Sequence, residues 1–89
     1  MNSNYKVTFS SDAEKVLFKL DKPTARRIFK ALELLAADPY HHANTKKMKG
    51  YEGEHYRLRM GNFRIIFEIM NNELIIFVIR IGPRGDVYK

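Results

Sequence analysis

The fold of this chain is decided by residues 56–67, which read Tyr-Arg-Leu-Arg-Met-Gly-Asn-Phe-Arg-Ile-Ile-Phe. Side chains of a β-strand alternate between its two faces, so Arg57 and Arg59 share one face and the apolar residues share the other. Gly61-Asn62 is typical of a two-residue hairpin loop. That loop predicts two antiparallel strands in which Arg59 lies directly opposite Arg64.

Three arginines on one strand face predict a binding surface for an anion. Arg57, Arg59 and Arg64 repel one another unless negative charge lies among them. A guanidinium group grips phosphate well because its planar fork donates two parallel hydrogen bonds. Exposed strand positions also carry arginine for purely structural reasons, and Glu68 is available as an ion-pair partner. Three arginines beside a basic loop and a basic C-terminal turn nevertheless favour a polyanion with regularly spaced phosphates.

The composition of the 89 residues indicates one domain that spans residues 1–89. A hydrophobic content of 45% excludes an intrinsically disordered chain. The absence of Cys excludes disulfides and thiolate metal sites. No segment has the apolar run of a signal peptide or a membrane span, so we expect a cytoplasmic protein without a membrane partner. The net charge of +6 suggests an acidic partner.

The spacing of apolar and polar residues predicts one strand, two helices and then three strands. These elements are a strand at 5–9, a helix with a capping box at Ser11 to Glu14, a helix from Pro23 to about Ala37, a loop at 39–53, and strands at about 54–60, 63–70 and 73–81. Asn71-Asn72 is expected to form the second tight turn. The last strand is apolar on both faces, so we expect it to lie centrally, between the first strand and the 63–70 strand.

This order of elements predicts an α+β fold. An N-terminal strand, a two-helix antiparallel hairpin and a three-stranded antiparallel meander are expected to form one mostly antiparallel sheet with the helices on one face. Ile28, Leu32 and Leu35 form the predicted buried stripe of the second helix. The arginines then lie on the uncovered face of the sheet.

The last residues add Arg84 and Tyr88 to the candidate site. Gly82, Pro83 and Gly85 predict a sharp turn around Arg84, directly after a central strand. Polar residues on loops that a rigid scaffold positions are often functional. Tyr88 is close to the C-terminus, where chains usually fray, so a loosely packed ring is the alternative interpretation.

The histidines do not predict a metal site. His41 and His42 are adjacent and lack the spacing of two ligands on one helix face, and no carboxylates stand at ligand spacing. His55 falls on the arginine side of its strand, where a solvated histidine is the simpler interpretation. We therefore expect neither a metal nor another cofactor.

Three segments resemble the RelE/ParE toxin superfamily, and within it the RelE-like mRNA endoribonucleases, or mRNA interferases, of type II toxin–antitoxin systems. They are Met48-Lys49-Gly50, residues 56–67 and Ile81-Gly82-Pro83-Arg84-Gly85-Asp86-Val87-Tyr88. The resemblance covers nearly the whole chain and implies a RelE-like microbial RNase fold. The 56–67 block is common to the wider superfamily, whereas the closing block is more specific to the RNase branch.

The resemblance implies an endoribonuclease toxin that cleaves mRNA in the ribosomal A site and so inhibits translation. The catalytic residues that it implies are Arg57, Arg59, Arg64, Arg84 and Tyr88. The expected reaction is a metal-independent attack of a ribose 2′-OH on the adjacent phosphate. Arg64 and Arg84 are expected to stabilise the transition state, and Tyr88 to act as general base or as a stacking ring. Pro83 and Gly85 replace charged residues of some relatives, so the identity of the general base stays open.

The resemblance also implies partners. They are a cognate antitoxin, the ribosome with its 16S rRNA and mRNA, and operator DNA that is reached only through the antitoxin complex. The residues expected to contact ribosomal RNA are Lys46, Lys47, Lys49, Arg26, Arg27 and Lys30. A solvated helix face is the alternative for the residues of the second helix. Two rival functions stay open: a ParE-like DNA gyrase inhibitor that binds protein without catalysis, and a non-catalytic nucleic-acid-binding module.

Overall fold

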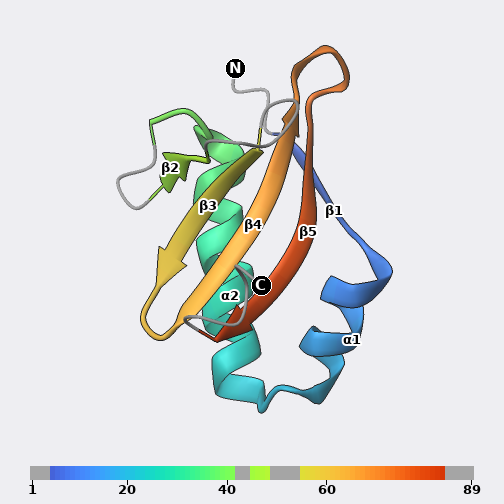
Figure 1. Cartoon of the computed structure of the whole chain (residues 1–89), viewed down its shortest axis with the longest axis vertical. Helices are drawn as coiled ribbons and strands as arrows, with labels where there is room; N and C mark the ends of the chain where they lie inside the picture. Colours follow the sequence, from blue (N-terminus) through green and yellow to red (C-terminus); the bar gives the residue numbers. More distant parts are fainter. Residues whose placement is uncertain (1–4, 42–44, 49–54, 84–89) are drawn as a thin grey trace.

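The computed structural model describes residues 5–41, 45–48 and 55–83. Its elements are, in chain order, β1 (Lys6–Phe9), α1 (Ser11–Lys19), α2 (Lys22–Ala37), β2 (Thr45–Lys47), β3 (His55–Met60), β4 (Phe63–Met70), the 3-10 turn η1 (Asn71–Glu73) and β5 (Ile75–Pro83). The strands form one five-stranded sheet in the order β1-β5-β4-β3-β2. Figure 1 shows α2 crossing one face of this sheet, and it confirms the predicted α+β fold.

Strand β5 lies between β1 and β4, as the apolar character of both its faces predicts. It pairs in parallel with β1 and antiparallel with β4. The remaining two pairs, β3 with β4 and β2 with β3, are also antiparallel. The sheet is therefore mostly antiparallel, and within the described residues β1 and β2 form its two edges.

Strand β2 is a correction to the prediction of a loop over residues 39–53. Thr45, Lys46 and Lys47 pair with β3. Two of these three residues are exposed lysines, so no apolar alternation marks the strand in the sequence. Lysine is common on edge strands because its charge discourages further pairing.

The β3–β4 hairpin forms as predicted. Met60 pairs with Phe63 and Arg59 pairs with Arg64. Gly61, the first loop residue, has a φ of +58°, a conformation that glycine adopts without a Cβ clash. The hairpin register thus fixes which side chains share a face.

The β4–β5 turn differs from the prediction of a two-residue turn at Asn71-Asn72. Met70 pairs with Ile75, so four residues connect the strands. Three of them form η1, and the fourth, Leu74, is left-handed with φ 54° and ψ 48°. The asparagines therefore do not supply the positive φ on which that prediction depended.

Helix α2 begins and ends where the sequence predicts. The Asp21 carboxylate accepts a hydrogen bond from the Thr24 backbone N–H at 3.2 Å, and Pro23 occupies the first turn. Hydrogen bonds from Thr24 hold the pKa of Asp21 below its ordinary value. Asp38 ends the helix immediately before Pro39.

The cap of α1 is Ser10 rather than Ser11, so the predicted capping box is wrong by one residue. The Ser10 hydroxyl accepts from the Ala13 N–H at 3.1 Å. The same hydroxyl donates to the Ile79 carbonyl at 2.6 Å. Ser10 therefore joins α1 to β5, a long-range contact that a local sequence pattern does not reveal.

The core lies between the helices and the helix side of the sheet. Its buried residues are Ala13, Ile28, Leu32, Leu35, Ala36, Leu58, Ile65, Phe67, Ile69, Ile76, Val78 and Ile81. The three residues of the predicted α2 stripe are among them. Ile66 is buried but does not belong to this cluster, because strand alternation turns it to the opposite face. None of the described helices is long and apolar enough to cross a membrane.

We predict that Ser10→Ala lowers the free energy of unfolding by about 1–2 kcal/mol, because the α1 N-cap and the bond to Ile79 are both lost. Ser11→Ala is the matched control, since Ser11 is exposed and a surface change of this kind stays within about 0.5 kcal/mol. Urea unfolding measures both variants. Equal effects of the two substitutions would contradict the assignment of Ser10 as the cap.

Candidate functional site

The side of the sheet away from the helices carries a set of basic residues that we call the arginine face. It consists of Lys46 on β2, Arg57 and Arg59 on β3, Arg64 on β4 and Arg80 on β5. Strand pairing puts Arg57 and Arg59 on the face opposite to the buried Leu58. The predicted side for Arg57, Arg59 and Arg64 is therefore confirmed.

Two rows of paired residues run across this face. In the first, Lys46 pairs with Arg57, Arg57 with Ile66, and Ile66 with Arg80. Residues directly opposite in neighbouring strands have their Cβ atoms about 5 Å apart, so the Lys46–Arg57 pair brings two cations together. The apolar side chain of Ile66 lies between Arg57 and Arg80 in this row.

The second row joins Arg59, Arg64 and Gly82. Arg59 and Arg64 are directly opposite, which makes them a like-charged pair of the kind that destabilises a bare sheet. Gly82 has no side chain, and it is buried together with Arg64. The two arginines together offer two guanidinium forks to one anion.

Arg64 is the most unusual residue of the face because only 6% of it is exposed. Its Nη1 donates a long hydrogen bond of 3.4 Å to the Phe63 carbonyl. Its buried Nε finds no hydrogen-bond acceptor among the described residues. Burying a charged group without partners is costly, so an anion that accepts from Nε relieves a cost already present in the folded chain.

Arg59 connects the arginine face with a groove on the helix side. Strand β2 begins at Thr45, opposite Leu58, so among the described residues Arg59 and Met60 of β3 have no partner strand on that edge. A groove of about 510 Å³ at this edge is lined by Arg26, Arg27, Lys30, Ala31, Leu34, Leu58, Arg59, Met60 and Gly61. The three α2 cations that the sequence assigns to RNA contact therefore gather with Arg59 rather than with Arg57 and Arg64.

Lys46 and Lys47 lie at the β2 edge. With Met48 and Arg57 they line a smaller hollow of about 340 Å³. Lys46 pairs with Arg57 and joins the arginine face, whereas Lys47 pairs with Tyr56 and so falls on the helix side. At this edge, Lys46 thus puts a positive charge on the arginine face and Lys47 puts one on the helix side of the sheet.

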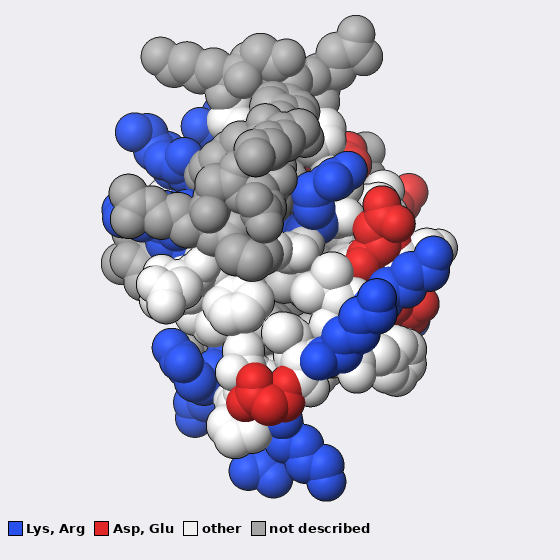
Figure 2. Space-filling view, turned by 60° about the horizontal axis from the view of Figure 1, so that its bottom comes forward, with Lys and Arg blue, Asp and Glu red and all other residues white. Residues whose placement is uncertain are grey.

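Within the described strands β3 and β4, Glu68 is the one acidic residue. His55 pairs with Glu68 further along β3 and β4, next to the Arg57 row. Figure 2 shows Lys and Arg side chains at several places on the surface, with much of the acidic surface gathered on one side. Glu68 is therefore a residue at the end of the face, and the rows that contain Arg59 and Arg64 carry no carboxylate.

Three predicted site residues, Lys49, Arg84 and Tyr88, lie outside the described residues. Arg80, in contrast, is a member of the face that the sequence did not predict. Simple alternation along β5 puts Arg80 on the side of the buried Ile76 and Val78. A shift of register opposite Ile66 and Phe67 moves Arg80 to the other side, and the improbable burial of an arginine is the signal that could have revealed it.

Comparisons with known proteins agree with the fold and with the resemblance. Residues 7–88 match the family described as the ParE toxin of the type II toxin–antitoxin system parDE. An Escherichia coli protein described as a RelE-like toxin is 33% identical over 88 residues, which is 96% of this chain and 90% of that protein.

Solved structures give the same result. A chain of the archaeal RelE–RelB complex from Pyrococcus horikoshii superposes with a TM-score of 0.80 at 25% identity, covering 94% of this chain and 99% of that one. The isolated E. coli RelE toxin superposes with a TM-score of 0.75 at 25% identity, covering 94% and 90% of the two chains.

We predict that Arg64→Met keeps or raises the free energy of unfolding, by up to about 4 kcal/mol, because methionine removes a buried charge whose Nε has no acceptor among the described residues. Added phosphate should raise the melting temperature of the wild type more than that of the variant, since a ligand stabilises only the form that binds it. Lys19→Met, at an exposed position on α1, is the control for a general loss of charge. A marked loss of stability in Arg64→Met would contradict the proposed cost of burying this arginine.

Proposed function

This chain belongs to the ParE toxin family of type II toxin–antitoxin systems, and from this premise we propose that it is a ribosome-dependent endoribonuclease. Its substrate is mRNA in the ribosomal A site, and its action stops translation. The observation that carries the proposal is the directly paired Arg59 and Arg64 on the arginine face, where Arg64 is buried and its Nε has no acceptor among the described residues. The phosphates of a bent RNA backbone are anions that two neighbouring arginines can bind.

The reaction that fits this inventory is an internal transfer of a phosphodiester. The ribose 2′-oxygen bonds to the adjacent phosphorus, the bond to the 5′-oxygen breaks, and the products are a 2′,3′-cyclic phosphate and a 5′-OH. A proton leaves the 2′-OH and a proton reaches the 5′-oxygen. Negative charge grows on the phosphoryl oxygens in between, and fixed cationic donors stabilise that charge most strongly.

Each residue has a proposed role in this scheme. Arg64 holds the phosphoryl oxygens, and Arg84 is its proposed companion from the C-terminal turn. Arginine keeps its proton at neutral pH, so Arg57 and Arg59 position the RNA rather than accept a proton. Tyr88 is the proposed base, because nearby positive charge lowers the pKa of a phenol.

The remaining basic residues are proposed to dock the chain on ribosomal RNA. Arg26, Arg27 and Lys30 surround the groove at the open edge of β3, and Lys46 and Lys47 line the edge at β2; Lys49 completes the set. Contacts of this kind neutralise phosphates and weaken as salt rises. The ribosome then supplies the in-line geometry of the mRNA, which makes cleavage of free RNA slow.

The proposed partner that controls the activity is a cognate antitoxin. RelE of Pyrococcus horikoshii was solved in complex with RelB, and we extend that partnership to this chain. The complex, rather than the toxin alone, would bind operator DNA. The setting of both activities is the cytoplasm.

A second function is favoured by the family description, which names ParE. In this alternative the chain inhibits DNA gyrase by binding the protein, and the arginine face has no catalytic role. The two functions differ in what is damaged in the cell. Cleaved messages indicate the first, and double-stranded DNA breaks with an SOS response indicate the second.

We predict that expression of the chain from a tight promoter produces codon-phased 5′ ends within reading frames on ribosome-bound messages. Mapping of 5′ ends on ribosomal and free RNA, with an SOS reporter in the same cells, checks this. Intact messages together with an SOS response would contradict mRNA cleavage and support gyrase inhibition instead.

We predict that Arg64→Ala reduces cleavage about 100- to 1,000-fold, the usual effect of removing one donor to the transition state. Lys19→Ala on α1 is the control, because this exposed cation lies on the helix layer. Full growth arrest with Arg64→Ala would show that Arg64 is not part of the catalytic site.

The Tyr88→Phe variant distinguishes two roles of Tyr88: lost cleavage indicates proton transfer by the phenol, and retained cleavage indicates that the ring only stacks on a base.

A further inference from the structure

The groove between α2 and the edge of β3, which we call the α2–β3 groove, combines apolar walls with a basic rim. Its apolar side chains come from Ala31, Leu34, Leu58 and Met60. Leu34 is 57% exposed, so part of this apolar surface faces solvent. The volume of about 510 Å³ lies within the range of small-ligand sites, which is roughly 300–1,000 Å³.

The rim of the α2–β3 groove is positively charged. Its cations are Arg26, Arg27 and Lys30 on α2 and Arg59 on β3. None of the described residues that line the groove is acidic. Asp21, at the start of α2, is near enough for Arg27 to help lower its pKa, although hydrogen bonds from Thr24 are the main cause. One carboxylate beside four cations leaves the rim positive, so charge complementarity requires an anionic occupant.

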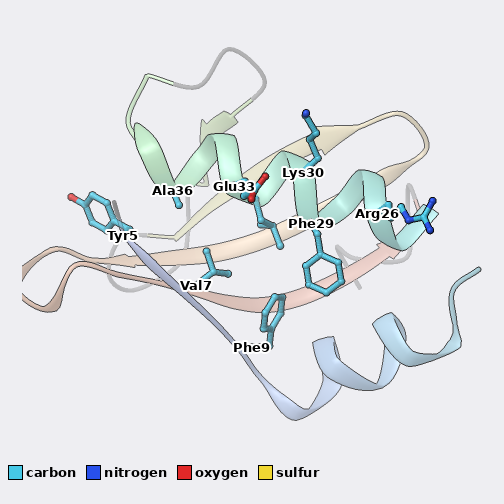
Figure 3. Close-up of a pocket in the computed structure, with 9 residues that line it drawn as sticks. Tyr5, Val7, Phe9, Arg26, Phe29, Lys30, Glu33 and Ala36 are labelled. Carbon is cyan, nitrogen blue, oxygen red and sulfur yellow. The ribbon is translucent and has the colours of Figure 1, made fainter. Parts of the chain in front are cut away.

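The guanidinium group of Arg27 lies against the β3–β4 hairpin loop. A Cβ at Gly61 would be 3.1 Å from Nη2 of Arg27, which is closer than most Cβ contacts, so the glycine permits this approach. Figure 3 shows Phe29 turned toward Phe9 on the β1 side of α2 and Lys30 directed away from it. Cations from the helix therefore reach the groove at the hairpin loop and along α2.

A nucleotide with an unstacked base matches both features of the groove. Its phosphate is an anion that a guanidinium fork binds with two parallel hydrogen bonds. The flat face of its base covers apolar side chains such as Leu34 and Met60. Proteins recognise single-stranded RNA by this combination of backbone contacts and bases held against side chains. A paired RNA helix keeps its bases stacked inside, so it would contact the rim and leave the apolar walls in water.

Arg59 favours RNA over an acidic peptide as the occupant. Its side chain lines the α2–β3 groove, and it pairs with Arg64 on the arginine face. The basic surface is therefore continuous around the β3 edge. The two RNAs of the proposed function can lie on either side of that edge, with mRNA on the arginine face and ribosomal RNA in the groove. An acidic peptide accounts for the groove alone.

We propose that the α2–β3 groove binds one unpaired nucleotide of ribosomal RNA, with its base on Leu34 and Met60 and its phosphates on Arg27 and Arg59. The inference rests on the ribosome docking of the proposed function and adds which element of the RNA is bound. Phosphate contacts alone hold RNA of any sequence, whereas a base seated in a groove fixes one position. The groove therefore sets the position of the arginine face relative to the mRNA.

The first experiment asks whether the isolated chain binds a base as well as a phosphate. The probes are AMP and ribose 5-phosphate, which share the sugar and the phosphate and differ in the base. NMR follows the methyl signal of Met60, which lines the groove. Leu34→Ser removes apolar surface from the groove. Leu74→Ser is the matched control, because Leu74 is also exposed, at 41%, and lies in the β4–β5 turn.

We expect the wild type and Leu74→Ser to bind AMP about 10-fold more tightly than ribose 5-phosphate, as for one base held on a protein surface. In Leu34→Ser this preference falls below about threefold, while the affinity for ribose 5-phosphate stays unchanged. Equal binding of the two probes by the wild type would overturn the inference, because the groove would then bind phosphate alone. An unchanged preference for AMP in Leu34→Ser would overturn it as well.

The second experiment identifies the occupant on the ribosome. The photo-cross-linking residue p-benzoylphenylalanine replaces Leu34 in one variant and Leu74 in the control variant, and each is irradiated with ribosomes. We expect a cross-link from position 34 to an unpaired nucleotide of ribosomal RNA, mapped by primer extension, and no cross-link to that nucleotide from position 74. A cross-link from position 34 only to a ribosomal protein, to mRNA or to a paired nucleotide would overturn the inference, and so would the absence of any cross-link.

Failure of this inference is distinguishable from failure of the proposed function. A wild type that cleaves mRNA on ribosomes but binds AMP and ribose 5-phosphate equally overturns the nucleotide site alone. A wild type that prefers AMP and cross-links to ribosomal RNA from position 34, yet leaves mRNA intact, supports the nucleotide site and contradicts the proposed cleavage.

Discussion

The packing of the α2 stripe against the sheet is the contact on which the rest of the structure depends. Ile28, Leu32 and Leu35 are buried against the side of the sheet that carries Leu58 and Phe67. Because side chains alternate along each strand, this choice of inner face sends every second residue of β3 and β4 to the other side. The arginine face is thus a direct consequence of where the apolar residues stand. A shift of register by one residue would bury arginines and expose the core.

The sequence predicts the structure correctly where local patterns and global packing agree. The β3–β4 hairpin, its register and the start of α2 depend on short-range chemistry, such as the loop glycine and the Asp21 cap, and they form as predicted. The errors arise where a distant partner decides. Ser10 caps α1 because it also bonds to Ile79, and β2 forms because β3 offers an edge. Leu74 takes the left-handed turn position although leucine is not a residue that favours it.

Arg80 shows most clearly why simple strand alternation does not predict every residue of the candidate site. Its side of the sheet depends on one extra residue in β5, opposite Ile66 and Phe67. A bulge of this kind reverses the alternation for the residues beyond it. The sequence predicts the face for Arg57 and Arg59 because their strand is regular. Lys49, Arg84 and Tyr88 fall outside the described residues, and their roles remain proposals.

On the arginine face, Arg59 and Arg64 put like charges at directly paired positions, and the Nε of Arg64 has no acceptor among the described residues. A bound phosphate would supply that acceptor.

The most direct test of the proposed mRNA cleavage in the ribosomal A site is a reconstituted reaction. Purified chain is added to ribosomes that carry a defined mRNA and an empty A site, and the products are analysed by primer extension and by the chemistry of their ends. We expect a cut within the A-site codon that leaves a 2′,3′-cyclic phosphate and a 5′-OH. An intact message under these conditions, with inhibition of DNA gyrase in a parallel supercoiling assay, would contradict it.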